Sequence, residues 1–341
     1  MTRRLNPLFW LAVAAALFCA CPNEVDRAAK KRIFSPEEPP KAKLAAAEPI
    51  AVDEIAESAD STYRVLAMSA AEAFERIGPF RFKATASFDW TYGKEAVSLS
   101  EQRSLEQASA LEYALHTENS RDYGMDLVRL TDRTFAKSKY HPFRERKRDR
   151  GQSDLMREDV FGALRSAQTL LSNRLALVRD RQEDVLGRKA KRFNFMISEK
   201  PLRALGPDPW KLPPVQYPAN GPDEATKRRV DFENLRKPRS VEGAVWVDLE
   251  TGVPLKSQLT ATIIAPGEEQ DEARLVLKIQ TELKPSAEPI AIAAPESFLP
   301  DQDRPTGIAA ALERFDMKRA DAGVASGAPS KPADAEDSPE D

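Results

Sequence analysis

The sequence has very few of the residues that build metal and redox sites. Only two of its 341 residues are cysteines, Cys19 and Cys21, and only two are histidines, His116 and His141. Both cysteines lie at the N-terminal end, so the rest of the chain has no disulfide partners and no thiolate ligands for zinc. The HExxH, GxSxG, GxxxxGK[ST] and GxGxxG patterns are also missing. We therefore expect no catalytic residues, no metal and no cofactor, and we expect that the chain is not an enzyme.

The chain has neither a surplus of basic residues nor a long apolar run. Its 51 lysines and arginines face 54 acidic residues, which gives a net charge of -3. Nucleic-acid-binding proteins concentrate positive charge, so nucleic acid is not an expected partner. The longest apolar run, residues 8–20, has 13 residues. A membrane-spanning helix needs about 20, so a multi-span membrane protein is excluded.

The N-terminal residues follow the pattern of a secretory signal peptide. Arg3 and Arg4 precede the apolar run, and small and thiol residues end it. The end of the run, Leu17-Phe-Cys-Ala-Cys21, resembles a bacterial lipobox. This resemblance implies a signal peptide over residues 1–20 and acylation of Cys21 by chains such as palmitate, which would anchor the protein in a membrane. Ordinary signal-peptidase cleavage next to two incidental cysteines is the alternative.

Two segments outside the central part have the composition of disordered chain. Residues 21–61 are rich in proline, alanine, glutamate and lysine, and they predict a flexible linker behind the lipid anchor. Residues 317–341 predict a disordered acidic tail, since residues 320–341 hold six acids and one lysine. Because Pro22 is not the aspartate typical of inner-membrane retention, we expect the periplasmic face of the outer membrane, with the inner membrane as the alternative.

The central part alternates helix and strand patterns. A helix is expected over residues 62–77, ending at Gly78-Pro79, and a strand follows in which every second residue from Phe80 to Trp90 is apolar. Residues 201–238 contain eight prolines, and we expect an insertion or lid at about 200–240. The remaining expected elements are strands at 96–105, 111–118, 124–130, 134–140, 185–198 and 274–283, a helix at 154–179, and a hairpin of 241–249 with 253–264.

The hairpin carries a family resemblance. The stretch VEGAVWVDLETGVPLK at residues 241–256, preceded by VLGRKAKRFNF at 185–195, resembles the periplasmic lipoprotein-carrier superfamily of LolA-like domains. The resemblance covers residues 62–283. It implies an α+β fold in which a curved antiparallel half-barrel sheet wraps around helices, within a domain of residues 62–316.

Two groups of side chains are candidate binding residues. The aromatic residues Phe80, Phe82, Phe88, Trp90, Phe193 and Phe195 could line a cavity for an apolar ligand, or they could form a packed core. Residues 137–150 hold seven basic and two acidic residues. This segment could contact an anionic partner, or it could be a solvated loop. The cations proposed for such contact are Arg144, Arg146, Lys147 and Arg148.

These patterns support two hypotheses about function. In the first, a membrane-tethered lipoprotein holds an acyl chain or another apolar ligand in a half-barrel cavity. In the second, the same fold is a structural or regulatory lipoprotein of the cell envelope and binds protein or glycan partners without a cavity. The acid Asp248, beside the expected turn at residues 250–252, is interpreted as bonding the turn amides and not as a catalytic group.

Overall fold

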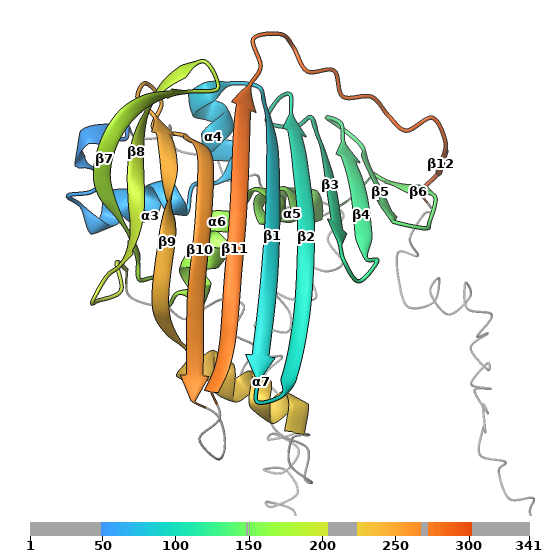
Figure 1. The fold of residues 1–341 in the computed structure, drawn as a ribbon. Helices are drawn as coiled ribbons and strands as arrows, with labels where there is room; N and C mark the ends of the chain where they lie inside the picture. Colours follow the sequence, from blue (N-terminus) through green and yellow to red (C-terminus); the bar gives the residue numbers. More distant parts are fainter. Residues whose placement is uncertain (1–48, 148, 150, 204–223, 267–271, 302–341) are drawn as a thin grey trace, which may run out of the picture. The chain divides into compact units, whose positions relative to one another are not determined.

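The folded part of the chain is built on one large sheet. The computed structural model describes residues 49–147, 149, 151–203, 224–266 and 272–301. Twelve strands follow the order β12-β6-β5-β4-β3-β2-β1-β11-β10-β9-β8-β7 (Figure 1). They are β1 (Phe80–Tyr92), β2 (Glu95–Gln107), β3 (Tyr113–Asn119), β4 (Gly124–Arg129), β5 (Thr134–Ser138), β6 (Phe143–Arg146), β7 (Leu175–Val185), β8 (Arg188–Ile197), β9 (Lys237–Asp248), β10 (Pro254–Pro266), β11 (Glu272–Pro285) and β12 (Phe298–Leu299).

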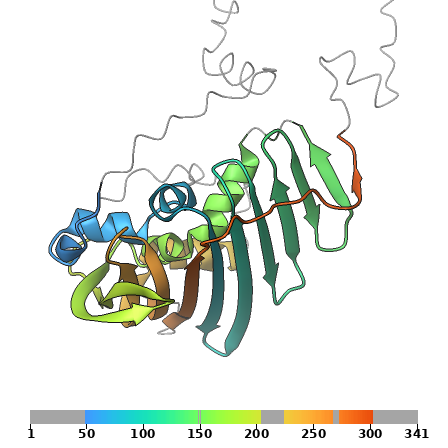
Figure 2. The same ribbon diagram turned by 90° about the horizontal axis from the view of Figure 1, so that it is seen from above.

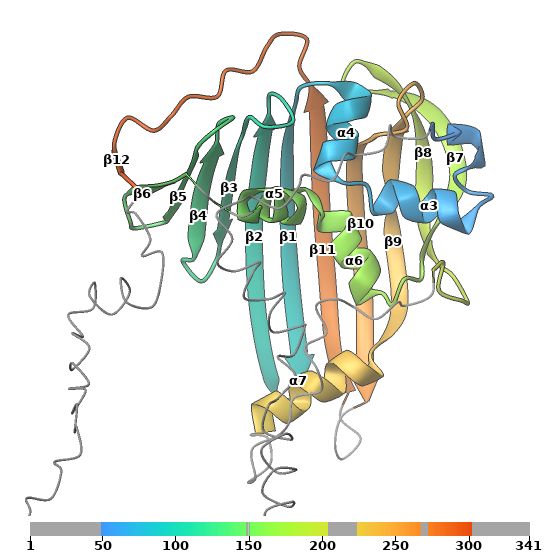
Figure 3. The same ribbon diagram turned by 180° about the vertical axis from the view of Figure 1, so that it is seen from behind.

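The helices lie against one face of this sheet, which curves around them (Figure 2). They are η1 (Val52–Glu54), α3 (Ala59–Leu66), α4 (Ala70–Ile77), α5 (Gln152–Phe161), α6 (Ala163–Leu170) and α7 (Glu224–Leu235). Figure 3 shows α3 to α6 over the upper part of the sheet and α7 across the opposite end of the strands. The expected α+β class, with a curved antiparallel sheet around helices, is confirmed. Among the described residues, no helix is both long and apolar enough to span a membrane.

The alternating pattern of β1 positions the core. Phe80, Phe82 and Ala84 are at most 4% exposed, and the residues between them face solvent. The neighbouring strand β11 pairs with β1 in register over its whole length and buries Leu277, Ile279 and Leu283 on the same side. The core therefore lies between the centre of the sheet and α3 to α6, as an amphipathic strand requires.

The fold begins before the expected end of the linker. Within the segment expected to be flexible, Val52 and Ile55 are 8% and 0% exposed and belong to the core. Asp53 forms an ion pair with Lys191 of β8, and Glu57 pairs with Arg179 of β7 at 2.9 Å. The apolar residues of this stretch are too few to give a sustained periodic signal next to the proline-rich segment before it, so the composition alone did not predict this contact.

The helix expected over residues 62–77 is two helices. Ser69 interrupts it, because its hydroxyl accepts a hydrogen bond from the amide of Glu72 at 3.0 Å and begins α4. Ser69-Ala-Ala-Glu72 is a capping-box sequence, which marks a helix start. The first helix, α3, begins earlier than expected, where Ser58 caps the amide of Ser61 at 3.3 Å.

The helix expected over residues 154–179 was wrong beyond residue 170. Gly162 divides its first part into α5 and α6, and Ser172 and Asn173 turn the chain with positive φ values of 55° and 56°. Leu175 then begins β7, and its backbone N–H and C=O both bond to the side-chain amide of Gln168 at 2.9 and 3.0 Å. The expected strand 185–198 is therefore the second half of a β7–β8 hairpin.

The other expectations agree with the structure to different degrees. The hairpin of 241–249 with 253–264 is confirmed as β9 and β10, and the strand at 274–283 as β11. Within the proline-rich segment, residues 224–235 form α7 and residues 237–240 begin β9. The signal peptide, Cys21, residues 204–223, the end of the expected domain and the acidic tail lie outside the described residues.

Candidate functional site

The expected aromatic cavity lining is divided between the core and one pocket. Phe80 and Phe82 pack on Phe161 of α5, with ring centroids 5.8 and 4.8 Å apart. Phe193 and Phe195 lie on β8 and are 0% and 6% exposed. The order of strands places them four strands from β1, a separation of about 19 Å at the usual strand spacing. The structure does not bring these four residues together into one site.

Buried core residues occupy the space between the sheet and α5 and α6. A cavity in this part of the structure measures about 20 Å³ and borders Phe82, Phe161 and Thr281. That volume holds about one water molecule. The aromatic side chains at this level of the sheet are therefore packed core, which was the second interpretation of the sequence.

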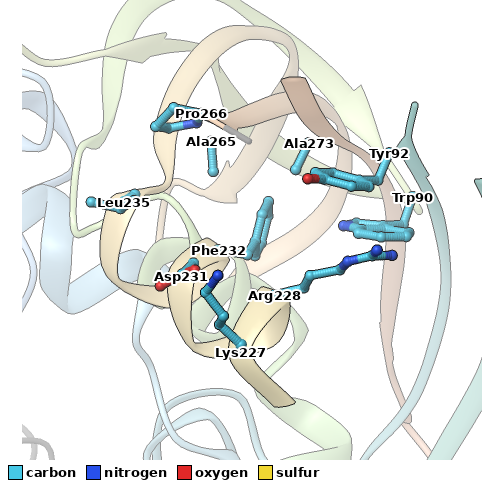
Figure 4. A pocket seen from close by; sticks show the side chains of 10 residues that line it. All are labelled: Trp90, Tyr92, Lys227, Arg228, Asp231, Phe232, Leu235, Ala265, Pro266 and Ala273. Atoms are coloured by element: carbon cyan, nitrogen blue, oxygen red, sulfur yellow. The ribbon is translucent and has the colours of Figure 1, made fainter. Parts of the chain in front are cut away.

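A larger pocket lies beneath α7, at the opposite end of the strands. Its volume is about 170 Å³, and Trp90, the sixth apolar residue of the β1 pattern, forms part of its wall (Figure 4). Phe88, one alternation earlier on the same face of β1, is half-buried and packs against the core. The pocket is lined by Trp90, Tyr92, Lys227, Arg228, Asp231, Phe232, Leu235, Ala265, Pro266 and Ala273.

The residues on three neighbouring strands explain why this pocket is open on the sheet side. Trp90 and Tyr92 are two residues apart on β1, so they share a face, and their rings stack 6.0 Å apart at an angle of 10°. Beside them, Ala265 of β10 pairs directly with Ala273 of β11. Two alanines beside a stacked aromatic pair leave a hollow, and Phe232 of α7 faces it from the helix side (Figure 4).

Arg228 attaches α7 to the sheet at this pocket through an ion pair and a cation–π contact. The guanidinium of Arg228 lies 4.9 Å from the centre of the Tyr92 ring and forms an ion pair with Glu95 of β2 at 3.2 Å. Lys227 and Asp231 add charged groups on the helix side of the pocket. The arrangement is an apolar hollow with polar groups on one side, which is the usual form of a small-molecule site.

The sequence pattern pointed to Trp90 but missed most of this site. The alternation of β1 continues through Tyr92, so extending the pattern by one residue would have included it. Phe232 lay in the segment that its prolines marked as irregular. The pairing of Ala265 with Ala273 depends on the register of two strands, for which the sequence has no local signal.

The basic segment is more neutral in the structure than in the sequence. Lys137 pairs with Asp126 at 3.2 Å, and Lys139 pairs with Glu118 and with Asp122, the latter at 2.6 Å. Acids from β3, β4 and the turn between them thus neutralise the first two cations. Asp149, one of the two acids of the segment, pairs instead with Arg129 of β4 at 3.2 Å.

The four cations proposed for partner contact have different environments. Arg144 is exposed, and Arg146 bonds the side chain of Gln152 at 3.1 Å. Lys147 is exposed, and its backbone amide donates to the carboxylate of Asp301 at 3.0 Å. Arg148 lies outside the described residues. A solvated loop was one of the two interpretations of this segment, but within it Phe143–Arg146 form β6.

The environment of Asp248 agrees with its interpretation as a turn residue. Its carboxylate accepts hydrogen bonds from the amide and hydroxyl of Thr251, at 3.0 and 2.6 Å. Arg188 adds a two-pronged contact at 2.8 and 2.9 Å. Burial alone would raise the pKa of the Asp248 carboxyl, but the hydrogen bonds from Arg188 and Thr251 outweigh it and hold that pKa below its ordinary value. In the part of the chain that is described, no three His, Cys, Asp or Glu side chains are placed to hold a metal ion.

Comparisons with known proteins find similarity only among solved structures. No family model and no curated protein matches the chain. The complex of MucA and MucB from Pseudomonas aeruginosa matches with 13% identity and a TM-score of 0.22, over 68% of this chain and 59% of that chain. A DUF1329 family protein from Desulfovibrio piger matches with 10% identity and a TM-score of 0.18, over 70% and 94%. A structure described as an outer membrane lipoprotein-sorting protein domain from Vibrio parahaemolyticus matches with 8% identity and a TM-score of 0.17, over 60% and 84%.

The chain spans about three fifths of the MucB-complex chain that it matches. The three TM-scores are 0.22, 0.18 and 0.17, so no function is transferred from these proteins. The functional conclusion rests on the geometry of this chain.

Proposed function

We propose that this chain is a periplasmic lipoprotein with a LolA-like domain, and that it binds the apolar part of a ligand in the pocket beneath α7. The observation that carries this proposal is the pocket of about 170 Å³ between Trp90, Tyr92 and Phe232. Aromatic walls around a hollow gain free energy when an apolar group replaces water. The domain resemblance and the tether rest on the sequence alone.

The volume of the pocket limits what it can hold. An apolar cavity of about 150 Å³ accepts one benzene molecule, so a space of about 170 Å³ suits a single ring or the end of an alkyl chain. A complete acyl chain would extend outside the described pocket. The charged side chains of Lys227, Arg228 and Asp231 lie on the helix side, so a ligand with one apolar end and a polar remainder fits best.

The proposed location depends on the N-terminal sequence. Arg3, Arg4 and the apolar run 8–20 support export, and Cys21 at its end supports acylation. The membrane would then be reached through the lipid anchor, and the ligand would come from the periplasm or from the membrane surface. Mass spectrometry of the mature N-terminus, with and without Cys21→Ser, tests this part separately.

Trp90→Ala is expected to weaken ligand retention about tenfold, because one wall of the pocket is lost. The full chain carrying Cys21→Ser is expressed to the periplasm and studied by native mass spectrometry and lipid extraction. The parent chain should carry an apolar adduct at a stoichiometry near one, and Trp90→Ala should lose most of it. Phe232→Ala on α7 should have the same effect.

Tyr123→Ala is the matched control, because Tyr123 is 72% exposed and lies outside the pocket. It should keep the adduct of the parent chain. Circular dichroism checks that each variant is folded. An adduct that survives in both Trp90→Ala and Phe232→Ala would place the ligand elsewhere and would contradict the proposed site.

A second candidate function is favoured by the packed interior. Since the cavity between the sheet and α5 measures only about 20 Å³, the half-barrel does not enclose an acyl chain at that level. A bare mass in repeated preparations would therefore favour an envelope protein that acts through its surface.

A further inference from the structure

One edge of the sheet is covered by a short segment of the chain's own C-terminal part. After β11, residues 286–297 pass the six strands between β11 and the far edge and lead to β12 on that edge (Figure 1, orange). There Phe298 and Leu299 pair with Phe143 and Arg144 of β6. This ladder is parallel, whereas the other ladders among the described residues are antiparallel.

The segment covers groups that would otherwise be exposed at the edge. The ring of Phe298 packs edge-on against Phe135 of β5, 4.8 Å between centroids, and Phe135 is 0% exposed. Glu145 of β6 is also buried. The carboxylate of Asp301 accepts from the backbone amide of Lys147 at 3.0 Å. Phe298 and, three residues later, Asp301 thus contact two features of this edge, the ring of Phe135 and the backbone amide of Lys147.

The segment uses only part of the edge that it covers. β6 has four residues, Phe143–Arg146, but β12 pairs with the first two. The next residue of the segment is Pro300, which has no N–H to donate and so cannot extend the ladder. The side chains of Phe298 and Leu299 also stay 37% and 42% exposed. The contact is therefore small, and a strand without proline could pair along all of β6.

We propose that the β6 edge is a binding site for an extended peptide of another protein, and that β12 occupies this site when the peptide is absent. The peptide would add as a parallel strand, place an aromatic side chain on Phe135 and place a carboxylate at the amide of Lys147. Strand addition takes its affinity from backbone hydrogen bonds and its specificity from alternate side chains. This proposal is independent of the pocket beneath α7.

A fluorescent peptide tests the proposal directly. The probe is the sequence of residues 296–302 carrying Pro300→Val, and its binding to the full chain with Cys21→Ser is followed by fluorescence anisotropy. In the protein, Phe298→Ala removes the ring contact of the chain's own strand, so it should bind the probe at least fivefold more tightly than the parent. Phe135→Ala removes the surface for the aromatic side chain and should abolish binding.

Phe298→Ala and Phe135→Ala remove opposite sides of the same ring contact. If that contact were only structural, the two variants would not differ in peptide binding. If Phe135→Ala does not fold, Phe135→Leu takes its place as the test variant. Leucine keeps the site filled, so this variant should keep its structure and bind the probe more weakly. A probe with alanine in place of its phenylalanine should not bind. The proposal is overturned if Phe298→Ala shows no saturable binding, or if it binds no more tightly than the parent chain.

Discussion

Gly243→Ala is expected to lower the free energy of unfolding by about 3 kcal/mol, because alanine meets both a strained backbone and a collision at this position. Gly243 has a φ of +114°, which L-residues rarely adopt. A Cβ there would lie 1.9 Å from the carbonyl oxygen of Gln258 on β10. Urea denaturation followed by circular dichroism measures the loss.

Gly187→Ala separates the two causes. Gly187, in the β7–β8 turn, also has a positive φ of +78°, but a Cβ there would meet nothing within 4 Å. Gly187→Ala should therefore lower the free energy of unfolding only through backbone strain, by about 1 kcal/mol. An equal loss in both variants would show that the close approach of β9 to β10 at Gly243 does not exist.

Asp248→Asn is expected to cost about 3 kcal/mol, because it removes the buried carboxylate that binds Arg188 and Thr251 and leaves the guanidinium with only the exposed carboxylate of Glu250, at 3.0 Å. The side chain of Asp248 is 2% exposed and that of Arg188 is 29% exposed. Glu106→Gln is the matched control, since it breaks the Arg81–Glu106 pair, whose side chains are 52% and 46% exposed. An exposed pair of this kind contributes less than about 1 kcal/mol.

The Asp248 pair should also give stability a defined dependence on pH. Its folded-state pKa lies below the ordinary value of 3.8, so the unfolded chain takes up the proton first as the pH falls. The contribution of the pair is therefore complete well above pH 3.8 and is lost as the pH decreases below that value. Denaturation between pH 7 and pH 3 should show a smaller acid loss in Asp248→Asn than in the parent chain. Equal acid losses would contradict the assignment.

The sequence predicted those parts of the fold in which local pattern and tertiary contact agree. Strand β1 was recognisable because its apolar residues alternate from Phe80 to Trp90, and the helices cover that same face. The β9–β10 hairpin was recognisable from its turn. Both patterns depend on neighbours in the chain, so no distant partner was needed to detect them.

The failures arose where a specific side-chain contact, which hydrophobic periodicity does not show, decided the structure. Leu171, Leu175 and Val178 continue a helical spacing, yet the chain turns at residues 172–173 because the amide of Gln168 satisfies the backbone of Leu175. The pocket was only partly predictable for the same reason. Phe232 lines it because α7 packs across β10, and the surrounding prolines hid that helix.

Strand β10 connects the end of the sheet near the start of the described chain with the end that holds the pocket. At one end, a Cβ on Gly252 in the β9–β10 turn would meet Ile50, which lies at the start of the described chain. At the other end, Ala265 and Pro266 border the pocket beneath α7. The strand between them runs from Pro254 to Pro266, about 40 Å of extended chain. The pocket proposed for the ligand therefore lies at the end of β10 that is remote from Ile50, where the described chain begins.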